Sequence, residues 1–186
     1  EFTRVPLPDH VEAFMSRYST VVLTYVRMRP LFYPVTLIDG MAAVMRRRQD
    51  VGLVLCGGTG HADEGVWPAV QEAIRRHDIA DRICFVDDFD HDAFLSALER
   101  SALYLRTPIT DGVASSVLES MALGIPVVAC DNGTRPVGVV TYPAADPEAL
   151  ATAVERVLGH RADVVAAMSQ VTAPDTLADE VALLTS

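Results

Sequence analysis

The sequence predicts an α/β fold, a doubly wound, Rossmann-like parallel sheet of about six strands in a three-layer α/β/α arrangement. Apolar, β-branched runs alternate with segments of helical periodicity about ten to fifteen residues long, which is typical of strands joined by helical crossovers. The runs are apolar almost throughout, which indicates burial on both faces of the sheet. Glycine-rich and acidic stretches follow several of them, and in such sheets the loops after the strands meet at one edge.

The expected strands are the runs richest in apolar and β-branched residues. They cover residues 20–26, 51–56, 82–86, 102–106, 127–129 and 139–142. The expected helices carry apolar residues at helical spacing, and two of them open on an Asp that suits an N-terminus. They cover residues 35–48, 66–77, 90–101, 146–158, 161–168 and 177–184, with one more helix after Gly112. Residues 1–19 are expected to form a linker that leads into a single domain over residues 20–186.

The composition argues against several classes of function. The formal net charge of −10 disfavours a nucleic-acid or anionic-membrane surface, because both need clustered Lys and Arg. No apolar run reaches the roughly 18 residues that a transmembrane segment needs. Cys56, Cys84 and Cys130 lie in or beside predicted strands, which is typical of reduced, buried thiols in a cytoplasmic protein. The chain starts at Glu1 without Met or a signal peptide, so we expect it to be a piece of a longer protein.

Residues 111–129 are the most informative stretch, and their pattern predicts a loop, a helix, a turn and a buried strand. Gly124 stands where a helix C-cap belongs, and Pro126 prevents the helix from continuing. By helical spacing, one face of this helix is small and polar, and its residues are Gly112, Ser115, Ser116 and Glu119. A neighbouring face should pack in the core, and its residues are Ala114, Val117, Leu118 and Met121.

The start of this helix predicts a ligand site. A helix N-terminus without bulky side chains binds phosphate through its backbone N–H groups. The groups in question are those of Gly112, Val113, Ala114 and Ser115. The carboxylates of Asp111 and Glu119 can accept hydrogen bonds from sugar hydroxyls. The combination suits a ligand with a diphosphate in the middle and hydroxylated rings at both ends, which describes a nucleotide-sugar.

The same stretch resembles the signature of the family 4, or group 1, retaining glycosyltransferases of the GT-B fold. That signature is an acid, Gly, six residues and Glu, followed by Gly-x-Pro-Val-Val-Ala. Asp111 and Glu119 match the two acids in spacing, and residues 124–129 complete the pattern. The family usually has Glu in place of Asp111, but a subset carries Arg-x-x-x-x-Asp-Gly, as residues 106–112 do here. The resemblance covers roughly residues 20–160.

The resemblance implies the donor-binding, C-terminal half of an enzyme that moves a sugar from a UDP- or GDP-sugar to an acceptor, with retention. It implies no required metal and no cofactor. In the family, Glu119 would hold the ribose hydroxyls and Asp111 the hydroxyls of the donor sugar. The acceptor site and a catalytic His would lie in an N-terminal domain missing from this chain, so we expect little transfer activity from the fragment alone. A peripheral attachment to the membrane through that missing half stays open.

The flanks of the motif match the family less closely. Arg27 stands where the family has the Arg of a diphosphate clamp, but Phe32 replaces the Lys of that clamp and Val26 replaces a usual Gly. Arg29, or Arg106 at the end of a predicted strand, would have to supply the missing charge.

The resemblance implies that backbone near Val86 and Asp88 lies against the nucleobase of the donor. The family also has a glycine-rich turn at Gly58, where a tight structural turn and a ligand contact both stay open. Arg135 lies in a loop on the ligand side and is a candidate contact to the donor sugar, with a structural turn as the alternative.

Several other functions stay open or are disfavoured. The main alternative is a non-catalytic domain that keeps the fold and serves as a partner-binding or regulatory module, which Phe32, Val26 and Asp111 support. An NAD- or FAD-binding domain is disfavoured, because residues 57–60 lack the G-x-G-x-x-G spacing. Residues 88–99 imitate a calcium loop but lack its glycine. The histidines show no metal-site spacing, and no serine stands in a G-x-S-x-G elbow.

Overall fold

The computed structural model describes residues 2–58, 62–87 and 89–169, and these form one six-stranded sheet with parallel pairings throughout. The strands are β1 (Thr20–Tyr25), β2 (Val51–Cys56), β3 (Ile83–Val86), β4 (Leu103–Arg106), β5 (Val127–Cys130) and β6 (Val140–Tyr142). Each agrees with a predicted strand to within one residue at either end. The predicted doubly wound α/β fold is therefore confirmed.

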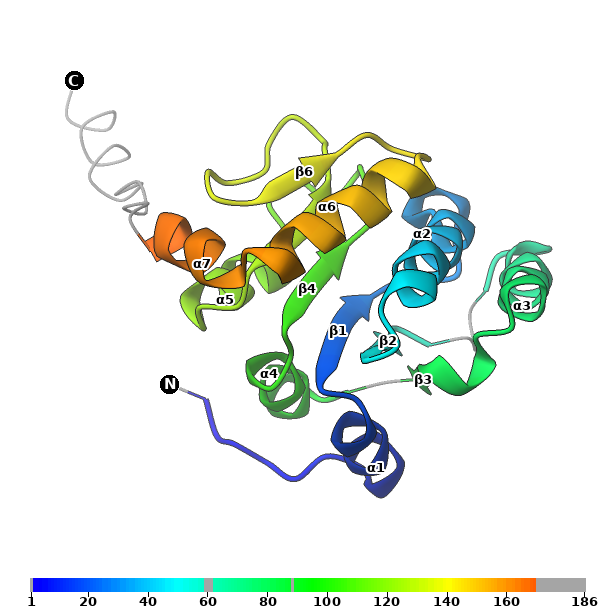
Figure 1. Cartoon of the computed structure of the whole chain (residues 1–186), viewed down its shortest axis with the longest axis horizontal. Helices are drawn as coiled ribbons and strands as arrows, with labels where there is room; N and C mark the ends of the chain where they lie inside the picture. The colour runs from blue at the N-terminus through cyan, green and yellow to red at the C-terminus, as the bar shows by residue number, and fades with distance from the viewer. Residues whose placement is uncertain (1, 59–61, 88, 170–186) are drawn as a thin grey trace.

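Helices cover both faces of the sheet (Figure 1). One face carries α2 (Pro34–Arg47), α3 (Val66–His77) and α6 (Pro147–Gly159). The other face carries α1 (Asp9–Arg17), α4 (His91–Glu99) and α5 (Ser115–Ala122). The remaining elements are α7 (Arg161–Ser169), which follows α6, and the 3-10 turns Pro30–Phe32 and Ala80–Arg82. Alternate residues of each strand enter the two cores, as the two-residue period of a strand requires.

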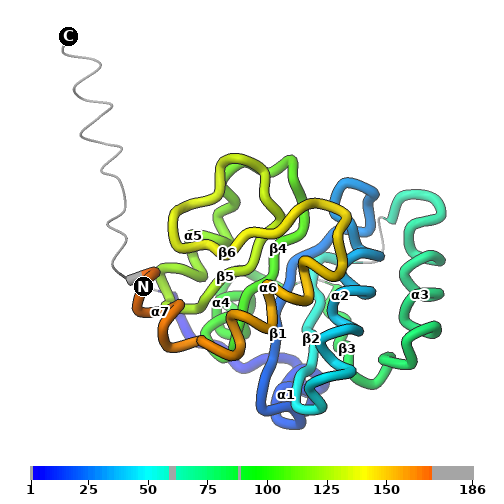
Figure 2. The backbone as a smooth tube through the Cα atoms, turned by 45° about the horizontal axis from the view of Figure 1, so that its top comes forward, coloured from blue at the N-terminus to red at the C-terminus, as the bar shows by residue number. Residues whose placement is uncertain are grey.

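The strand order β3-β2-β1-β4-β5-β6 places a topological switch point between β1 and β4. From β1 the chain builds outward to β2 and β3, then crosses back and adds β4, β5 and β6 on the other side of β1 (Figure 2). The connections after β1 and β4 leave the sheet toward opposite faces, and this opens a crevice at the carboxyl ends of these strands. Thr24 links the two strands there, because its hydroxyl donates to the carbonyl oxygen of Leu105 at 2.8 Å.

The N-terminal segment packs against the sheet. Its buried side chains are Leu7, Val11, Met15 and Tyr18. Tyr18 lies so close to β2 that a Cβ on Gly52 would come within 2.6 Å of its ring, which explains the glycine inside this strand. Residues 7–18 therefore contribute to the core, and the boundary expected between a linker and the domain at residue 20 stays a prediction.

The start and one face of α5 differ from the prediction. The helix begins at Ser115, and Gly112 lies before it in a loop with a positive φ of 54°, so Gly112 does not share the helical face. Leu118 was expected in the core but is 50% exposed. The reason is the orientation of this short helix, which buries Val117 and Ser120.

Other helix ends follow the prediction. Gly124 has a φ of 71° just beyond α5, in a Schellman motif. Asp90 and Asp146 cap α4 and α6, and each carboxylate accepts from the backbone N–H three residues on, at 2.8 and 2.9 Å. The helix expected over residues 177–184 lies outside the described residues. In the part of the chain that the structure describes, no helix is long and apolar enough to cross a membrane.

Candidate functional site

A pocket of about 530 Å³ opens at the carboxyl ends of the strands, beside the switch point between β1 and β4. Seven of the predicted site residues line it, which brings together the residues of the central motif. They are Arg106, Asp111, Val113, Ala114, Ser115, Ser116 and Glu119. Gly112 and Arg135 lie next to this lining, because the side chain of Arg135 contacts both Asp111 and the carbonyl oxygen of Gly112.

Five lining residues were missed by the sequence analysis. They are Tyr25, Cys56, Phe89, His91 and Phe94. Tyr25 and Cys56 are the last residues of β1 and β2, and His91 directly follows the predicted cap Asp90. Their positions at or just after the ends of predicted strands could have identified them as pocket residues, because strand ends and loops at this edge face the ligand in such folds.

Arg106, Asp111 and Arg135 form a buried arginine–aspartate cluster at the pocket. Nε of Arg106 donates to Oδ2 of Asp111 at 2.7 Å, and Nη2 of Arg135 lies 3.1 Å from Oδ1. The side chains are 9%, 16% and 2% exposed in that order. Such burial strengthens the pairing and makes the loss of any member costly.

Arg135 holds the loop before α5 in place. Its guanidinium donates to the carbonyl oxygens of Cys130 at 3.0 Å, Pro108 at 2.6 Å and Gly112 at 3.3 Å. These bonds tie the connection after β4 to the end of β5. The guanidinium is thus engaged with the protein itself, and its expected contact with a donor sugar stays a prediction.

The guanidinium of Arg106 lies over two aromatic rings. The centre of its guanidinium is 5.7 Å from the Tyr25 ring centroid and 5.9 Å from that of Phe32, and Nη1 donates to the Tyr25 carbonyl at 3.1 Å. The face of an aromatic ring attracts a cation, whereas a Lys at position 32 would repel Arg106. The pairing gives a physical reason for Phe32 where the resemblance expects Lys.

Glu119 on α5 is paired with His91 on α4. Nε2 of His91 lies 2.9 Å from Oε1 of Glu119. The pKa of His91 is raised above its usual value, chiefly by the hydrogen bond with Glu119. Glu119 is 27% exposed and His91 is 68% exposed, so the pair stands at the open side of the pocket.

The N-terminus of α5 faces the pocket through small residues. Ala114 is the N-cap and supplies no side-chain acceptor, while Ser115 and Ser116 line the pocket. The hydroxyl of Tyr104 donates to Oγ of Ser116 at 2.8 Å, and burial raises the pKa of Tyr104 to about 12. The first N–H groups of the helix are therefore available to an anion, as predicted for a phosphate site.

Other predicted contacts lie outside the lining of this pocket. Arg27 is exposed just after β1, and its Nε donates to the hydroxyl of Tyr25 at 3.3 Å. Val86 is buried at the end of β3. Gly58 has a φ of 75°, and an added Cβ would come within 3.1 Å of a carbonyl oxygen in the loop after β3. Asp88 is outside the described residues, and all these roles stay predictions.

In the described parts of the chain, neither a reactive thiol nor a metal site is found. Cys56, Cys84 and Cys130 are free and buried, as expected. Burial raises the pKa of the Cys56 thiol at the pocket, which keeps it protonated and unreactive. Across residues 2–58, 62–87 and 89–169, no group of three or more His, Cys, Asp and Glu side chains could hold a metal ion.

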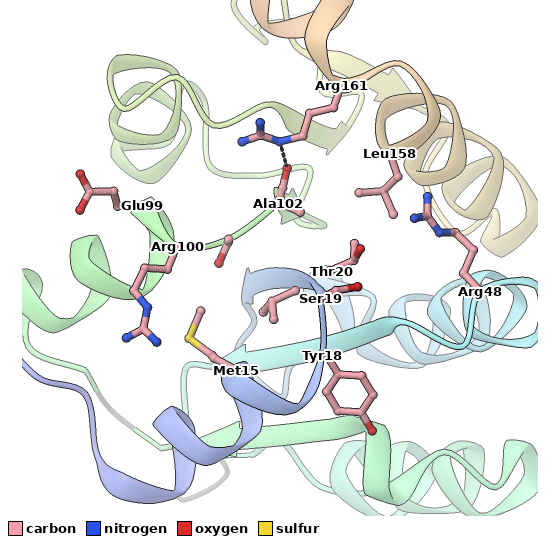
Figure 3. Close-up of a pocket in the computed structure, with 12 residues that line it drawn as sticks. Met15, Tyr18, Ser19, Thr20, Arg48, Glu99, Arg100, Ala102, Leu158 and Arg161 are labelled. Atoms are coloured by element: carbon pink, nitrogen blue, oxygen red, sulfur yellow. Dashed lines mark hydrogen bonds between the residues drawn. The ribbon is translucent and has the colours of Figure 1, made fainter.

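A second pocket, of about 510 Å³, lies at the opposite, amino ends of β1 and β4 (Figure 3). Arg48, Arg100 and Arg161 surround it. Arg48 pairs with Asp50 at 3.2 Å, and Arg100 pairs with Glu12 at 2.7 Å. Nε of Arg161 donates to a backbone carbonyl at 3.0 Å. Ligands of doubly wound sheets bind at the carboxyl ends, so we assign the candidate site to the first pocket.

Solved structures share this fold over most of the chain. The trehalose-6-phosphate synthase OtsA superimposes with a TM-score of 0.71 at 14% identity, over 88% of this chain and 42% of that one. Anabaena HepE, solved with UDP-glucose, gives 0.71 at 18% identity, over 86% of this chain and 44% of that one. The C-terminal domain of the group 1 glycosyltransferase LpcC from Francisella tularensis gives 0.71 at 12% identity, over 88% and 89%. The chain thus spans less than half the length of OtsA and HepE.

Two comparisons concern the sequence itself. A comparison with curated proteins found no match. The family model described as "Glycosyl transferases group 1" matches residues 9–160. Because this match spans well over half of the chain, the chain belongs to the group 1 glycosyltransferases.

Proposed function

We propose that the chain is the donor-binding half of a retaining glycosyltransferase, a hexosyltransferase that uses a UDP- or GDP-sugar. The observation that carries the proposal is the pocket at the switch point, which combines the carboxylates of Asp111 and Glu119 with the N-terminus of α5. Carboxylates accept hydrogen bonds from sugar hydroxyls, and a helix N-terminus binds phosphate. The pocket therefore offers suitable partners to the ribose, the diphosphate and the donor sugar of a nucleotide diphosphate sugar.

Each residue has a role in this proposal. Glu119 accepts the ribose hydroxyls, and Asp111 accepts those of the donor sugar. Oδ1 of Asp111 is buried and lies 3.1 Å from Nη2 of Arg135, but it accepts no hydrogen bond from the described residues, so a sugar hydroxyl that reached it would satisfy it. The backbone N–H groups of residues 112–115 bind phosphate oxygens.

The arginine–aspartate cluster supplies the charge that the diphosphate needs. Two guanidinium groups face one carboxylate there, which leaves a net positive charge at the pocket wall. Arg106, with Arg27 beyond the end of β1, neutralises the diphosphate and stabilises the leaving nucleotide, so the reaction requires no metal ion and no cofactor. A cation from β4 thus takes the place of the Lys that Phe32 replaces.

The other half of the enzyme completes the reaction in this proposal. An N-terminal domain binds the acceptor and supplies the remaining catalytic groups in the cytoplasm, with a membrane attachment through that half as an option. Exposed apolar side chains at this edge of the sheet suit burial against such a domain. They are Leu31, Val113 and Val137, which lie in the connections after β1, β4 and β5. The departures at Phe32, Val26 and Asp111 are the support for the non-catalytic alternative, and the described residues add no further observation that favours it. We expect the isolated chain to bind donor weakly and to transfer little sugar.

Calorimetric titration with UDP and with GDP tests the proposal. We expect saturable binding of one of them, and an affinity about ten- to a hundredfold lower in Glu119→Ala, because a hydrogen bond to a charged group contributes about 1.5–3 kcal/mol. Glu72→Ala is the control, since Glu72 forms a surface ion pair with Arg75 on the distant helix α3, and it should bind as the wild type does. Unchanged affinity in Glu119→Ala, or no binding by the folded wild type, would contradict the proposal.

A further inference from the structure

The pocket contains a pair that the donor contacts proposed above do not require. His91 is the first residue of α4, and Glu119 lies in the middle of α5. The imidazole reaches across from one helix to the other and meets the carboxylate at 2.9 Å. Both side chains line the pocket, and the imidazole is the more exposed of the two. His91 is therefore placed to fix Glu119 and to exchange protons with solvent.

The geometry lets Glu119 hold two partners at once. A carboxylate offers two oxygens and about four lone-pair sites. The hydrogen bond with His91 uses Oε1, so Oε2 keeps its own lone pairs for hydroxyl donors. A carboxylate anchored through one oxygen loses rotamer freedom before the ligand arrives, and this lowers the entropic cost of binding. The pair thus preorganises Glu119.

The charges around His91 favour its protonated form. Asp90, the N-cap of α4, and Asp92 in its first turn flank His91, and Glu119 faces it from α5. On the far wall of the pocket, Asp111 is paired with both Arg106 and Arg135, so this cluster is net positive and adds no negative charge at His91. The exposed Asp87 precedes α4 in the chain. A nucleotide diphosphate would bring further negative charge into the same pocket, and an adjacent anion favours the imidazolium.

We propose that His91 is a positioning residue that holds the Glu119 carboxylate ready for the ribose and takes up a proton when a nucleotide diphosphate sugar binds. This rests on the proposed function of the pocket. The proton comes from solvent and joins Nδ1, because Nε2 of the neutral imidazole already carries the hydrogen that it donates to the Glu119 carboxylate. Bound His91 is then a cation between Glu119 and the incoming phosphates. As this N–H bond forms, the bond to hydrogen in hydronium or in the buffer acid breaks and leaves water or the conjugate base, and no other covalent bond changes.

The proposal fixes the direction of the pH dependence. The pKa of His91 is higher in the donor complex than in the protein without donor. The affinity for the donor therefore increases as the pH falls through the interval between these two pKa values. Below both values His91 is protonated with and without the donor, and the affinity levels off. A nucleotide diphosphate sugar is the right probe, because its phosphodiesters do not titrate near neutrality, unlike the terminal phosphate of UDP.

Calorimetry in two buffers of different ionisation enthalpy counts the protons. We expect wild type to take up part of a proton on binding UDP-glucose or GDP-mannose at pH 7.5. His91→Gln keeps a neutral donor for Glu119, so it should bind within about threefold of wild type without proton uptake. His91→Ala should bind about three- to tenfold more weakly. His160→Gln, an exposed histidine after α6, is the matched control and should behave as wild type.

The outcomes separate this inference from the proposed function. Donor binding without proton uptake, or equal uptake in His91→Gln, would overturn the role of His91 and leave the donor site intact. Failure of the wild type to bind either nucleotide sugar would overturn both. An NMR titration of His91 tests the pair without any nucleotide. The pKa of His91 should be lower in Glu119→Gln than in wild type, because the variant lacks the charged acceptor. An unchanged pKa would show that the pair does not form in solution.

Discussion

The two ends of the sheet carry pockets of nearly equal volume, both bordered by arginines, yet they differ in how those charges are arranged. At the amino end, the ion pairs Arg48–Asp50 and Arg100–Glu12 are half-exposed. At the carboxyl end, Arg106 and Arg135 share one buried carboxylate, and a helix N-terminus opens beside them. Cavity size and arginine content therefore do not identify the ligand site in such a fold. The site is identified by the burial of the charged groups and by its position at the carboxyl ends of the strands.

The largest effect should come from breaking the buried cluster. Arg135→Ala removes three hydrogen bonds to backbone carbonyls and one partner of Asp111, so we expect a loss of about 3–5 kcal/mol in the free energy of unfolding. Arg100→Ala at the amino end removes a half-exposed pair and should cost less than about 1 kcal/mol. Urea denaturation measures both. Equal losses of unfolding free energy in Arg135→Ala and Arg100→Ala would contradict the view that the charges at the carboxyl end are more strongly coupled to the fold.

A smaller effect is expected from Arg106→Lys, which keeps the charge but loses the planar fork and the contacts of the guanidinium with the Tyr25 and Phe32 rings. We expect about tenfold weaker binding of the nucleotide in calorimetry, because Lys cannot reproduce both contacts of the guanidinium. The same change at the amino end, Arg161→Lys, should leave the affinity within about twofold. Wild-type affinity in Arg106→Lys would mean that the diphosphate draws its counter-charge from another residue.

The smallest effect concerns Asp50 beside the amino-end pocket. Hydrogen bonds from Arg48 and Thr20 lower the pKa of Asp50 to about 2. A carboxyl whose pKa is lowered by folding stabilises the protein above its unfolded pKa of about 3.9, and the contribution disappears as the pH falls toward 2. Since Asp50 is 40% exposed, Asp50→Asn should cost less than about 1 kcal/mol at pH 7.

Urea midpoints at pH 7 and pH 2.5 check this expectation. The difference between Asp50→Asn and wild type should shrink at the lower pH, because the wild-type carboxyl is then partly protonated. A difference that stayed constant between the two pH values would show that the ionised form of Asp50 contributes nothing.

Local patterns in the sequence predicted the elements well, because apolar runs, the caps Asp90 and Asp146 and the glycine after α5 act over a few residues. The start of α5 was predicted two residues early, since nothing in the residues before Ser115 supplies a side-chain cap to mark it. The central motif supplied most of the pocket lining, because its residues are consecutive along one loop and helix.

Contacts between distant residues could not be predicted in the same way. His91 and Glu119 are 28 positions apart and meet because α4 and α5 pack side by side on one face of the sheet. The stacking of Phe32 on Arg106 joins the loop after β1 to the end of β4 across the switch point. These partners depend on strand order, which the alternation of strands and helices does not fix.

The most direct test of the account is a map of backbone amide shifts in ¹H–¹⁵N NMR spectra as UDP and then GDP are added to the chain. The account predicts that the shifts concentrate at residues 112–119 and at His91, which border the carboxyl-end pocket. It also predicts that Arg48 and Arg161, at the other end of the strands, stay unchanged. Shifts confined to the amino-end pocket, or none at high nucleotide concentration, would contradict the assignment of this edge of the sheet as the donor site.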